Sequence, residues 1–220
     1  MDAQDPGELF DLYTREGAPL GQRKPRGQVH RDGDWHRSLH LWIWGMLDGA
    51  PHLVLQRRSA GKDTWPRALD VAVAGHVRAG ESIEATLREA EEEIGLVVLP
   101  AELTRLGLRR RPDRRPGVID NELQEIFARG APAPLAALVP CPAELESILA
   151  LPFADARRVL GEGQEATGRR LVREGNRAWF VDEQVSGGDL VPAPDGYYAT
   201  AVASLAVLLE GGTPVAWEIG

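Results

Sequence analysis

A glycine-rich turn over residues 75–80, followed at once by a short acidic helix, is the feature that most constrains this chain. Gly95 is expected to end the helix, because glycine readily adopts the left-handed conformation found after helix C-termini. Glu89, Glu92 and Glu93 stand at i, i+3 and i+4, so their carboxylates share one helix face. A separate apolar stripe consists of Ile83, Leu87, Ala90 and Ile94. The pattern predicts a helix that packs on one side and is acidic on another.

The acidic face is unfavourable unless something binds to it. Like charges at this spacing repel by about 0.2–0.5 kcal/mol per pair on an exposed helix. Three carboxylates that face one point suit a hard divalent cation with oxygen ligands, Mg²⁺ above all. A solvated acidic face is the commoner outcome for a bare acidic triplet, but here the glycines and Arg88 form a fixed frame around it. We therefore predict a metal site on this helix.

This stretch resembles the Nudix box, the signature of enzymes that cleave diphosphate linkages in nucleoside diphosphates joined to another group. The family pattern is a Gly, five residues, a Glu, seven residues, and then Arg-Glu-apolar-any-Glu-Glu-any-Gly-apolar. Gly75, Glu81 and residues 88–96 fit this pattern. The chain departs from it in one place, because only the six residues 82–87 separate Glu81 from Arg88. The acidic face survives this shortening, and the direction of the Glu81 side chain stays open.

Composition describes an ordinary globular protein. The 220 residues are 43% hydrophobic and 26% charged, which suits one domain with a substantial core. We find no run of 18 apolar residues and no signal-peptide pattern, and the single cysteine, Cys141, suits a reducing compartment. A net charge of −8 disfavours nonspecific nucleic-acid binding. We expect a cytoplasmic protein with no membrane or nucleic-acid partner.

Hydrophobic patterning predicts the remaining elements. An Asp48-Gly49 turn signal indicates a hairpin between its flanking apolar runs. Prolines exclude a helix from residues 131–142, and a loop dense in arginine is expected over residues 109–115. Short segments are expected at 9–13 and 27–30, strands at 39–46, 53–57, 69–74, 103–108, 118–128 and 177–181, and helices at 143–151 and 197–209.

Segments 24–40 and 57–76 resemble the isopentenyl-diphosphate isomerase-like branch of the Nudix superfamily. In the isomerases, two histidines near the first core strand, one in the box turn and two acidic residues hold a metal. The resemblance implies a possible second metal set made of His30, His36, His76, Asp120 and Glu122, with His40 as the alternative to His36. Arg58 and Lys62 match the diphosphate-contacting pair of these enzymes.

Two departures from the isomerases point to hydrolysis. Isomerases carry a proton-transferring cysteine one position before the Gly-His of the turn, and that position here is Ala74, which cannot transfer a proton. Isomerases also have a degraded acidic helix, whereas Glu89, Glu92 and Glu93 are intact here. Two alternatives to a hydrolase remain. One is an isomerase with a substitute for the cysteine, and the other is a binding module without turnover.

The resemblance implies an α/β fold, the Nudix α/β/α sandwich with a mixed central sheet. The whole chain, 1–220, would form one domain with an N-terminal elaboration at 1–34, a core at 35–185 and a C-terminal helix and tail at 186–220. Nudix proteins are often dimers, so a homodimer is possible.

The implied reaction is attack of water on a phosphorus of a small-molecule diphosphate, assisted by Mg²⁺ or Mn²⁺. The Gly75 carbonyl, with Glu89, Glu92 and Glu93, would hold the metal. Arg88 would orient the carboxylates. The first candidate for the general base is Glu122, and the second is Glu93. Which diphosphate is cleaved is left open by the sequence.

Overall fold

The computed structural model describes residues 5–62 and 64–220, so residues 1–4 of the expected N-terminal elaboration and residue 63 of the loop before the box lie outside the described residues. Within these residues, twelve strands form one sheet: β1 (Leu9–Tyr13), β2 (Pro19–Pro25), β3 (Trp35–Leu47), β4 (Ala50–Arg58), β5 (Leu69–Val71), β6 (Val73–His76), β7 (Thr104–Arg115), β8 (Val118–Gly130), β9 (Leu145–Pro152), β10 (Ala166–Glu174), β11 (Arg177–Val185) and β12 (Trp217–Ile219). The helices are α1 (Arg26–Asp32), α2 (Arg88–Ile94), α3 (Phe153–Ala156) and α4 (Tyr197–Leu209), with short helical turns at Ala85–Leu87, Pro100–Glu102, Leu135–Ala137, Arg157–Gly161 and Gly187–Asp189.

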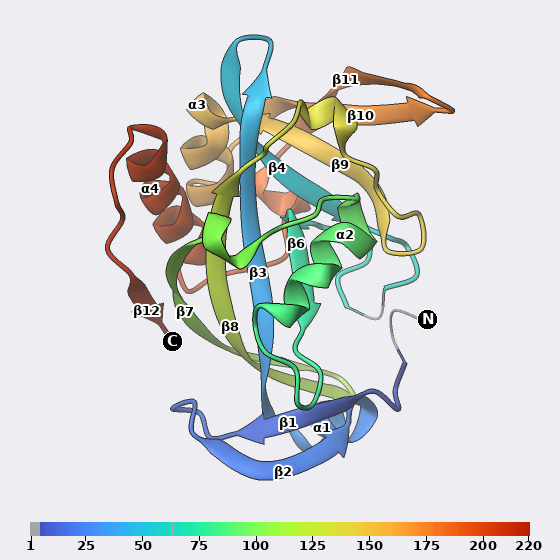
Figure 1. Cartoon of the computed structure of the whole chain (residues 1–220), viewed down its shortest axis with the longest axis vertical. Helices are drawn as coiled ribbons and strands as arrows, with labels where there is room; N and C mark the ends of the chain where they lie inside the picture. The colour runs from blue at the N-terminus through green and yellow to red at the C-terminus, as the bar shows by residue number, and fades with distance from the viewer. Residues whose placement is uncertain (1–4, 63) are drawn as a thin grey trace.

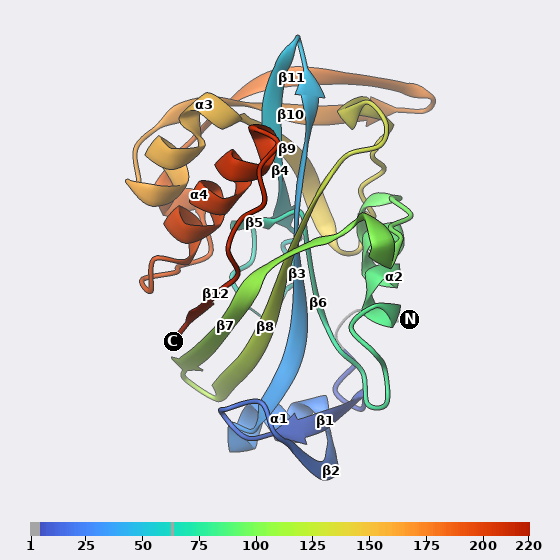
Figure 2. The same cartoon turned by 60° about the vertical axis from the view of Figure 1, so that its left-hand side comes forward.

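The sheet is mixed and lies between helices. Its main path runs β11-β10-β9-β4-β3-β8-β7-β12, and the parallel pairs on this path are β3 with β8 and β7 with β12. Helix α2 covers one face of the sheet, while α3 and α4 cover the other (Figures 1 and 2). The expected α/β/α sandwich with a mixed central sheet is therefore confirmed.

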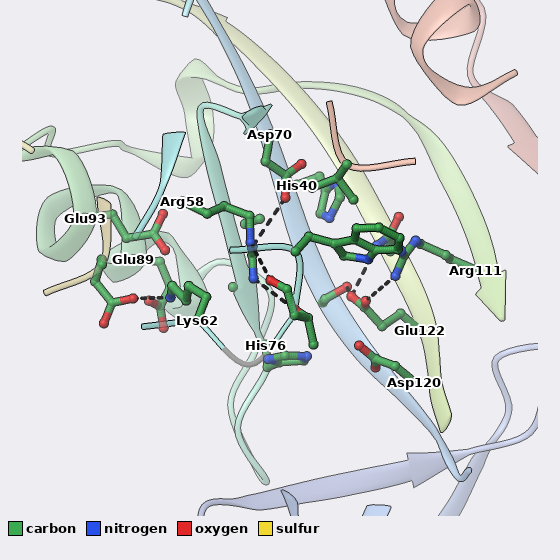
Figure 3. Close-up of a pocket in the computed structure, with 18 of the residues that line it drawn as sticks. His40, Arg58, Lys62, Asp70, His76, Glu89, Glu93, Arg111, Asp120 and Glu122 are labelled. Atoms are coloured by element: carbon green, nitrogen blue, oxygen red, sulfur yellow. Dashed lines mark hydrogen bonds and ion pairs between the residues drawn. The ribbon is translucent and has the colours of Figure 1, made fainter. Parts of the chain in front are cut away.

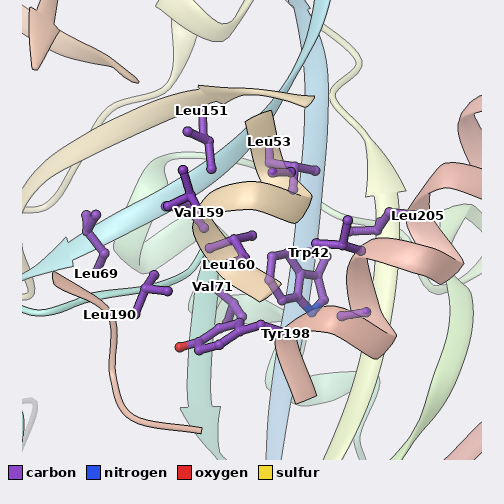
Figure 4. Close-up of a cluster of buried hydrophobic side chains, with 14 of the residues drawn as sticks. Trp42, Leu53, Leu69, Val71, Leu151, Val159, Leu160, Leu190, Tyr198 and Leu205 are labelled. Carbon is purple, nitrogen blue, oxygen red and sulfur yellow. The ribbon is translucent and has the colours of Figure 1, made fainter. Parts of the chain in front are cut away.

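Alternation along β3 builds a separate core on each face, because successive side chains in a strand point to opposite sides. Leu41 and Ile43 pack toward α2, where Ile94 is fully buried. Trp42 points to the other face and packs with Leu205 of α4 (Figure 4). Burying a side chain of this size stabilises the fold by about 1.5–3 kcal/mol. These two cores clamp the central strands in position.

The sheet face beneath α4 changes from apolar to polar along the central strands. On β3, the apolar position is Trp42, and the buried positions before it on the same face are His36, Ser38 and His40. On the neighbouring β8, the same change separates the buried Ile126 and Ala128 from Asp120, Glu122 and Gln124. Buried polar groups are costly without partners. The polar half of this face is therefore a candidate site.

Two predictions from the sequence are wrong. Residues 143–151 do not form a helix, because β9 occupies Leu145–Pro152 between β4 and β10. Ile148, Leu149 and Ala150 are all buried, so both faces of this strand are apolar, and such a run shows no strand-like alternation. The arginine-rich stretch is not a loop either, since β7 continues to Arg115 and turns into β8 through Gly117.

The local predictions agree with the structure. The strands expected at 39–46 and 53–57 lie within β3 and β4, and the Asp48-Gly49 turn between them has positive φ at both residues. The helix at 197–209 matches α4. The segment at 27–30 lies in α1, and the strand expected at 69–74 is divided into β5 and β6. Among the described helices, none is long and apolar enough to cross a membrane.

Candidate active site

Arg88 holds the carboxylates of the acidic helix together. Its Nε donates to Glu81 Oε1 at 2.9 Å and its Nη1 donates to Glu92 Oε2 at 3.1 Å. The same Nη1 also contacts Glu89. Glu81 accepts a further bond from the Arg78 amide at 3.1 Å, which fixes it in the turn. The shortened spacing therefore leaves Glu81 directed at Arg88, which settles the direction that the sequence left open.

Gly75 permits the close approach of Glu89 to the turn. It lies on β6, opposite Leu39 of β3, and α2 packs beside it. A Cβ atom at this position would lie 2.6 Å from Cγ of Glu89 and 3.0 Å from its Cδ. Real Cβ atoms do not approach so closely, so only glycine fits here. The Glu89 carboxylate consequently lies near the backbone of the turn.

Glu93 is a buried carboxylate without a full set of partners. Its side chain is 3% exposed, and Oε2 has no hydrogen-bond partner among the described residues. Burial raises the pKa of Glu93 well above its ordinary value, although Lys62 and Arg58 oppose the shift. Burial likewise raises the pKa of Glu89. A bound cation would relieve both carboxylates, so these residues fit a metal site.

Basic side chains and the carboxylates line one pocket (Figure 3). Arg58 is held by Thr64, donating from Nε to the carbonyl at 3.1 Å and from Nη2 to Oγ1 at 3.0 Å. Lys62 makes an ion pair with Glu144. Both line the pocket together with Glu89, Glu92 and Glu93, and Ala74 lines it as well. The structure thus brings the predicted substrate-binding pair and the predicted metal ligands to the same cavity.

A second cluster gathers at the α1 end of the pocket. His30, His36, His76 and Asp120 each offer a ligand atom, and these atoms lie within 4.8 Å of one another. Nε2 of His30 and of His36 lie 3.6 and 3.5 Å from Asp120 Oδ1. The three Nε2 atoms and Oδ1 are buried and lack hydrogen-bond partners among the described residues. Four orphaned polar atoms that converge in this way fit a metal ion.

The protonation states of the three histidines in this cluster suit metal binding, whereas Asp120 must lose its proton when a metal binds. Burial lowers the pKa of His30 to about 4 and also lowers the pKa of His36 and His76, so the rings stay neutral. Burial raises the pKa of Asp120 to about 7. Nδ1 of His36 lies 3.2 Å from the Asp34 carbonyl, which leaves Nε2 free to ligate. Arg26 approaches Nδ1 of His76 at 3.3 Å, so ligation through Nε2 of His76 requires this contact to open.

His40 and Glu122, the other candidates for the second metal set, have hydrogen-bond partners of their own. His40 does not join the cluster, because its Nδ1 lies 3.0 Å from the Tyr197 hydroxyl. Glu122 lies in the same pocket, but its oxygens accept bonds from Ser38 Oγ at 2.5 Å and Gln124 Nε2 at 3.2 Å. Burial opposes ionisation of Glu122, yet the charged groups around it, Arg111 among them, outweigh burial and hold its pKa well below the usual range. Its roles as metal ligand and general base stay predictions.

Reasoning from the sequence missed two arginines. Arg109 and Arg111 line the pocket, although a soluble loop was expected there. Arg109 donates to Asp195 at 2.6 and 2.9 Å, and Arg111 lies 3.5 Å from Glu122. The sequence signal that could have identified them is their separation by two residues, which places both side chains on the same face of a strand. Recognising it required knowing that β7 continues this far.

The burial of His40 predicts a loss of stability in acid. Its pKa is about 4 in the folded protein, chiefly because of burial, and about 6.5 in the unfolded chain. The unfolded chain therefore binds more protons between these values. From about pH 7 to about pH 5, the free energy of unfolding should fall by on the order of 2 kcal/mol from this histidine. Urea denaturation at the two pH values measures this fall in the free energy of unfolding. The fall should be smaller in the His40→Phe variant, and an equal fall in the two proteins would contradict the assignment.

Comparison with known proteins identifies the family. A family model described as the NUDIX domain matches residues 37–173. The chain is 30% identical over 201 residues to an uncharacterized Nudix hydrolase from Clostridium acetobutylicum, covering 90% of this chain and 97% of that protein. It is 36% identical over 165 residues to Nudix hydrolase 3 from Arabidopsis thaliana, covering 72% of this chain but only 21% of the plant protein.

Two further comparisons concern the branch and the fold. The chain is 32% identical over 130 residues to an isopentenyl-diphosphate Delta-isomerase from Clavibacter sepedonicus, covering 58% of this chain and 66% of that protein. The crystal structure of DR0079 from Deinococcus radiodurans has a TM-score of 0.51 and 22% identity over 67% of this chain and 85% of that chain, which supports the fold alone. The chain belongs to the NUDIX domain family and, within it, resembles the isopentenyl-diphosphate isomerase-like branch.

Proposed function

We propose that this protein is a Mg²⁺-dependent hydrolase that cleaves a diphosphate linkage in a nucleoside-diphosphate or related small-molecule substrate. The observation that carries the proposal is the meeting of an intact carboxylate set, Glu89, Glu92 and Glu93, with two basic side chains in one pocket. The pocket has Ala74 where the isomerases carry their cysteine. Metal-assisted attack of water needs the carboxylates and does not need the cysteine.

The three carboxylates and the Gly75 carbonyl would hold Mg²⁺, for which Mn²⁺ can substitute, since hard cations prefer oxygen ligands. When bound, the metal polarises phosphoryl oxygens and acidifies water. The partnerless Oε2 of Glu93 supports this assignment. Arg88 keeps the carboxylates oriented through its bonds to Glu81 and Glu92. Its proposed role is positioning rather than contact with substrate.

The chain itself would bind the substrate and move the proton. Arg58 and Lys62 would contact the diphosphate, because both basic groups line the same pocket as the carboxylates. Glu122 and Glu93 remain the candidates for the general base. The lowered pKa of Glu122 makes it a weak base, whereas the raised pKa of Glu93 favours proton uptake when no metal is bound. Substituting each residue in turn and recording a pH–rate profile separates the two.

The histidine cluster would hold a second metal. Three imidazole nitrogens and one carboxylate suit Mn²⁺ or Zn²⁺ better than Mg²⁺, which prefers oxygen. The four orphaned atoms of His30, His36, His76 and Asp120 support this site. Glu122 stays a possible further ligand from the same pocket.

Metal binding to the cluster should be visible as thermal stabilisation. With Mg²⁺ in excess to occupy the carboxylates, Mn²⁺ at about 100 times its Kd should stabilise the folded state by about 2.7 kcal/mol. For a chain of this size, that corresponds to an increase in Tm of about 5–10 °C. The His36→Gln variant should lose this increase, because it removes one ligand. His52→Gln is the matched control, since His52 is equally buried but bonds to the Ala50 carbonyl elsewhere. Equal stabilisation of the His36 variant would contradict the site.

A cleavage screen that follows the products by phosphorus NMR tests the proposed reaction. Diphosphate compounds that include nucleoside diphosphates, sugar nucleotides, dinucleotides, isoprenoid diphosphates and thiamine diphosphate are incubated with Mg²⁺ or Mn²⁺. We expect metal-dependent cleavage of at least one compound. The absence of cleavage across the panel would count against hydrolysis.

One observation favours a second candidate, an isopentenyl-diphosphate isomerase-like enzyme. Four residues of the metal set that the resemblance to isomerases implies, His30, His36, His76 and Asp120, lie close together. The chain is also 32% identical over 130 residues to one isomerase. Such an enzyme would convert isopentenyl diphosphate into its allylic isomer without releasing phosphate. The same screen distinguishes the two reactions by their products.

A further inference from the structure

His40 lines the pocket but belongs to neither the acidic helix nor the histidine cluster (Figure 3). It lies on β3 directly across from Ala74 of β6, so the two side chains are neighbours on the same sheet face. The carboxylates of Asp70 and Glu122 and the guanidinium of Arg111 also line this part of the pocket. The Nδ1 atom of His40 has a protein partner and Nε2 has none among the described residues, so Nε2 is the ring nitrogen available to a bound molecule.

The hydrogen bonds between Trp42, Tyr197 and His40 indicate the tautomer of the His40 ring. The Trp42 indole Nε1–H, which can only donate, points to the Tyr197 hydroxyl oxygen at 3.1 Å. Tyr197 is 1% exposed, so its own O–H must donate to a protein group. The acceptor within reach among the described residues is Nδ1 of His40, at 3.0 Å. This arrangement favours the tautomer in which Nδ1 of His40 is unprotonated and Nε2 carries the proton.

The groups that impose this tautomer are rigid. The Arg109 guanidinium lies 4.3 Å from the centre of the Tyr197 ring and is itself held by two bonds to Asp195. Trp42 is fully buried in the core beneath α4. Neither Tyr197 nor Trp42 can turn away without leaving a buried polar group unpaired. The direction of the proton on His40 is thus built into the fold.

We propose that His40 is a substrate-binding residue whose Nε2–H donates to an acceptor atom of the group attached to the diphosphate, with Tyr197 as the positioning residue that fixes the donor. The proposal rests on the proposed function for the identity of the ligand. A hydrocarbon group at this position would leave the donor unpaired, so the pocket discriminates against prenyl chains. The donor stands beside Ala74, where the isomerases resembled by this chain have a cysteine.

The tautomer is tested first, by nitrogen-15 NMR of the histidine rings, which requires no substrate and no turnover. We expect the Nε2–H form of His40 in the wild-type protein and a mixture of tautomers in the Tyr197→Phe variant. Tyr198→Phe is the matched control, because Tyr198 donates its hydroxyl to the Val191 carbonyl at 2.9 Å and does not contact His40. The Nδ1–H form in the wild-type protein, or an unchanged ring in the Tyr197 variant, would overturn the proposal.

Binding is tested next, by calorimetry without metal, so that the probes are not cleaved, using ADP and isopentenyl diphosphate as probes. ADP should bind more tightly, and its affinity should fall about tenfold in the His40→Phe and Tyr197→Phe variants but not in Tyr198→Phe. Isopentenyl diphosphate should be insensitive to all three substitutions. Equal binding of the two probes, or an unchanged ADP affinity in the His40 variant, would overturn the proposal. Failure of the hydrolase assignment would instead appear as an absence of cleavage by the unsubstituted protein.

Discussion

Replacing Glu93 by glutamine should lower metal-dependent cleavage at least about a hundredfold while leaving the protein folded, since removing one group that stabilises the transition state commonly has an effect of this size. Glutamine has nearly the same shape as glutamate but lacks the charge that holds a cation. Glu93 is 3% exposed and has an orphaned oxygen, so the substitution removes a carboxylate that has little other use in the fold. Burial already opposes its ionisation, which means that the uncharged side chain should be tolerated.

The measurement is the rate of diphosphate cleavage with Mg²⁺, followed by phosphorus NMR, together with thermal unfolding without metal. Glu92→Gln should also lose activity, because Glu92 shares the helix face and bonds to Arg88. Glu91→Gln is the matched control, since Glu91 is an exposed glutamate on the same helix and does not line the pocket. Full activity in both the Glu92 and Glu93 variants would rule out the proposed hydrolase.

The Gly75→Ala variant should lose most activity through steric displacement. The added Cβ would lie 2.6 Å from Cγ of Glu89, so either the carboxylate or the turn must move. A displacement of about 1 Å in a positioned catalytic group can reduce the rate about a hundredfold. Overpacking a buried site in this way also costs about 1–3 kcal/mol of stability. We expect a folded protein with a lowered Tm and weakened metal-dependent cleavage.

Gly61→Ala is the matched control for this substitution. Gly61 precedes Lys62 in the loop before the box, and an added Cβ there meets nothing within 4 Å among the described residues. Its backbone does not require positive φ. The rate of diphosphate cleavage and thermal unfolding are compared for both variants. If Gly75→Ala cleaved substrate as fast as Gly61→Ala, the close packing of Glu89 against the turn would have no catalytic importance.

The elements governed by local signals could be predicted from the sequence. The Asp48-Gly49 hairpin depends on two residues that tolerate positive φ, and α4 depends on its own spacing of apolar residues. The acidic helix can also be recognised locally, because its apolar residues follow helical spacing and Gly95 ends it in the left-handed conformation. Strand β9 was missed because a central strand buried on both faces has no alternation to read.

The candidate site depended on contacts between distant strands, which the sequence does not contain. His36 and His40 lie on the same face of β3, so periodicity cannot choose between them. The parallel pairing of β3 with β8 determines which of the two histidines belongs to the cluster. His36 lies opposite Glu122, close to Asp120, whereas His40 lies opposite Ile126. The inward direction of Arg109 and Arg111 likewise follows from the length and register of β7.

The most direct test of hydrolysis is to run the reaction with Mg²⁺ in water labelled with oxygen-18 and to follow the products by phosphorus NMR. The account predicts that one labelled oxygen enters a phosphoryl product for every linkage cleaved, and that the Glu93→Gln variant abolishes this incorporation. Conversion of isopentenyl diphosphate into its isomer, with no phosphorus–oxygen bond broken and no label on phosphorus, would contradict it.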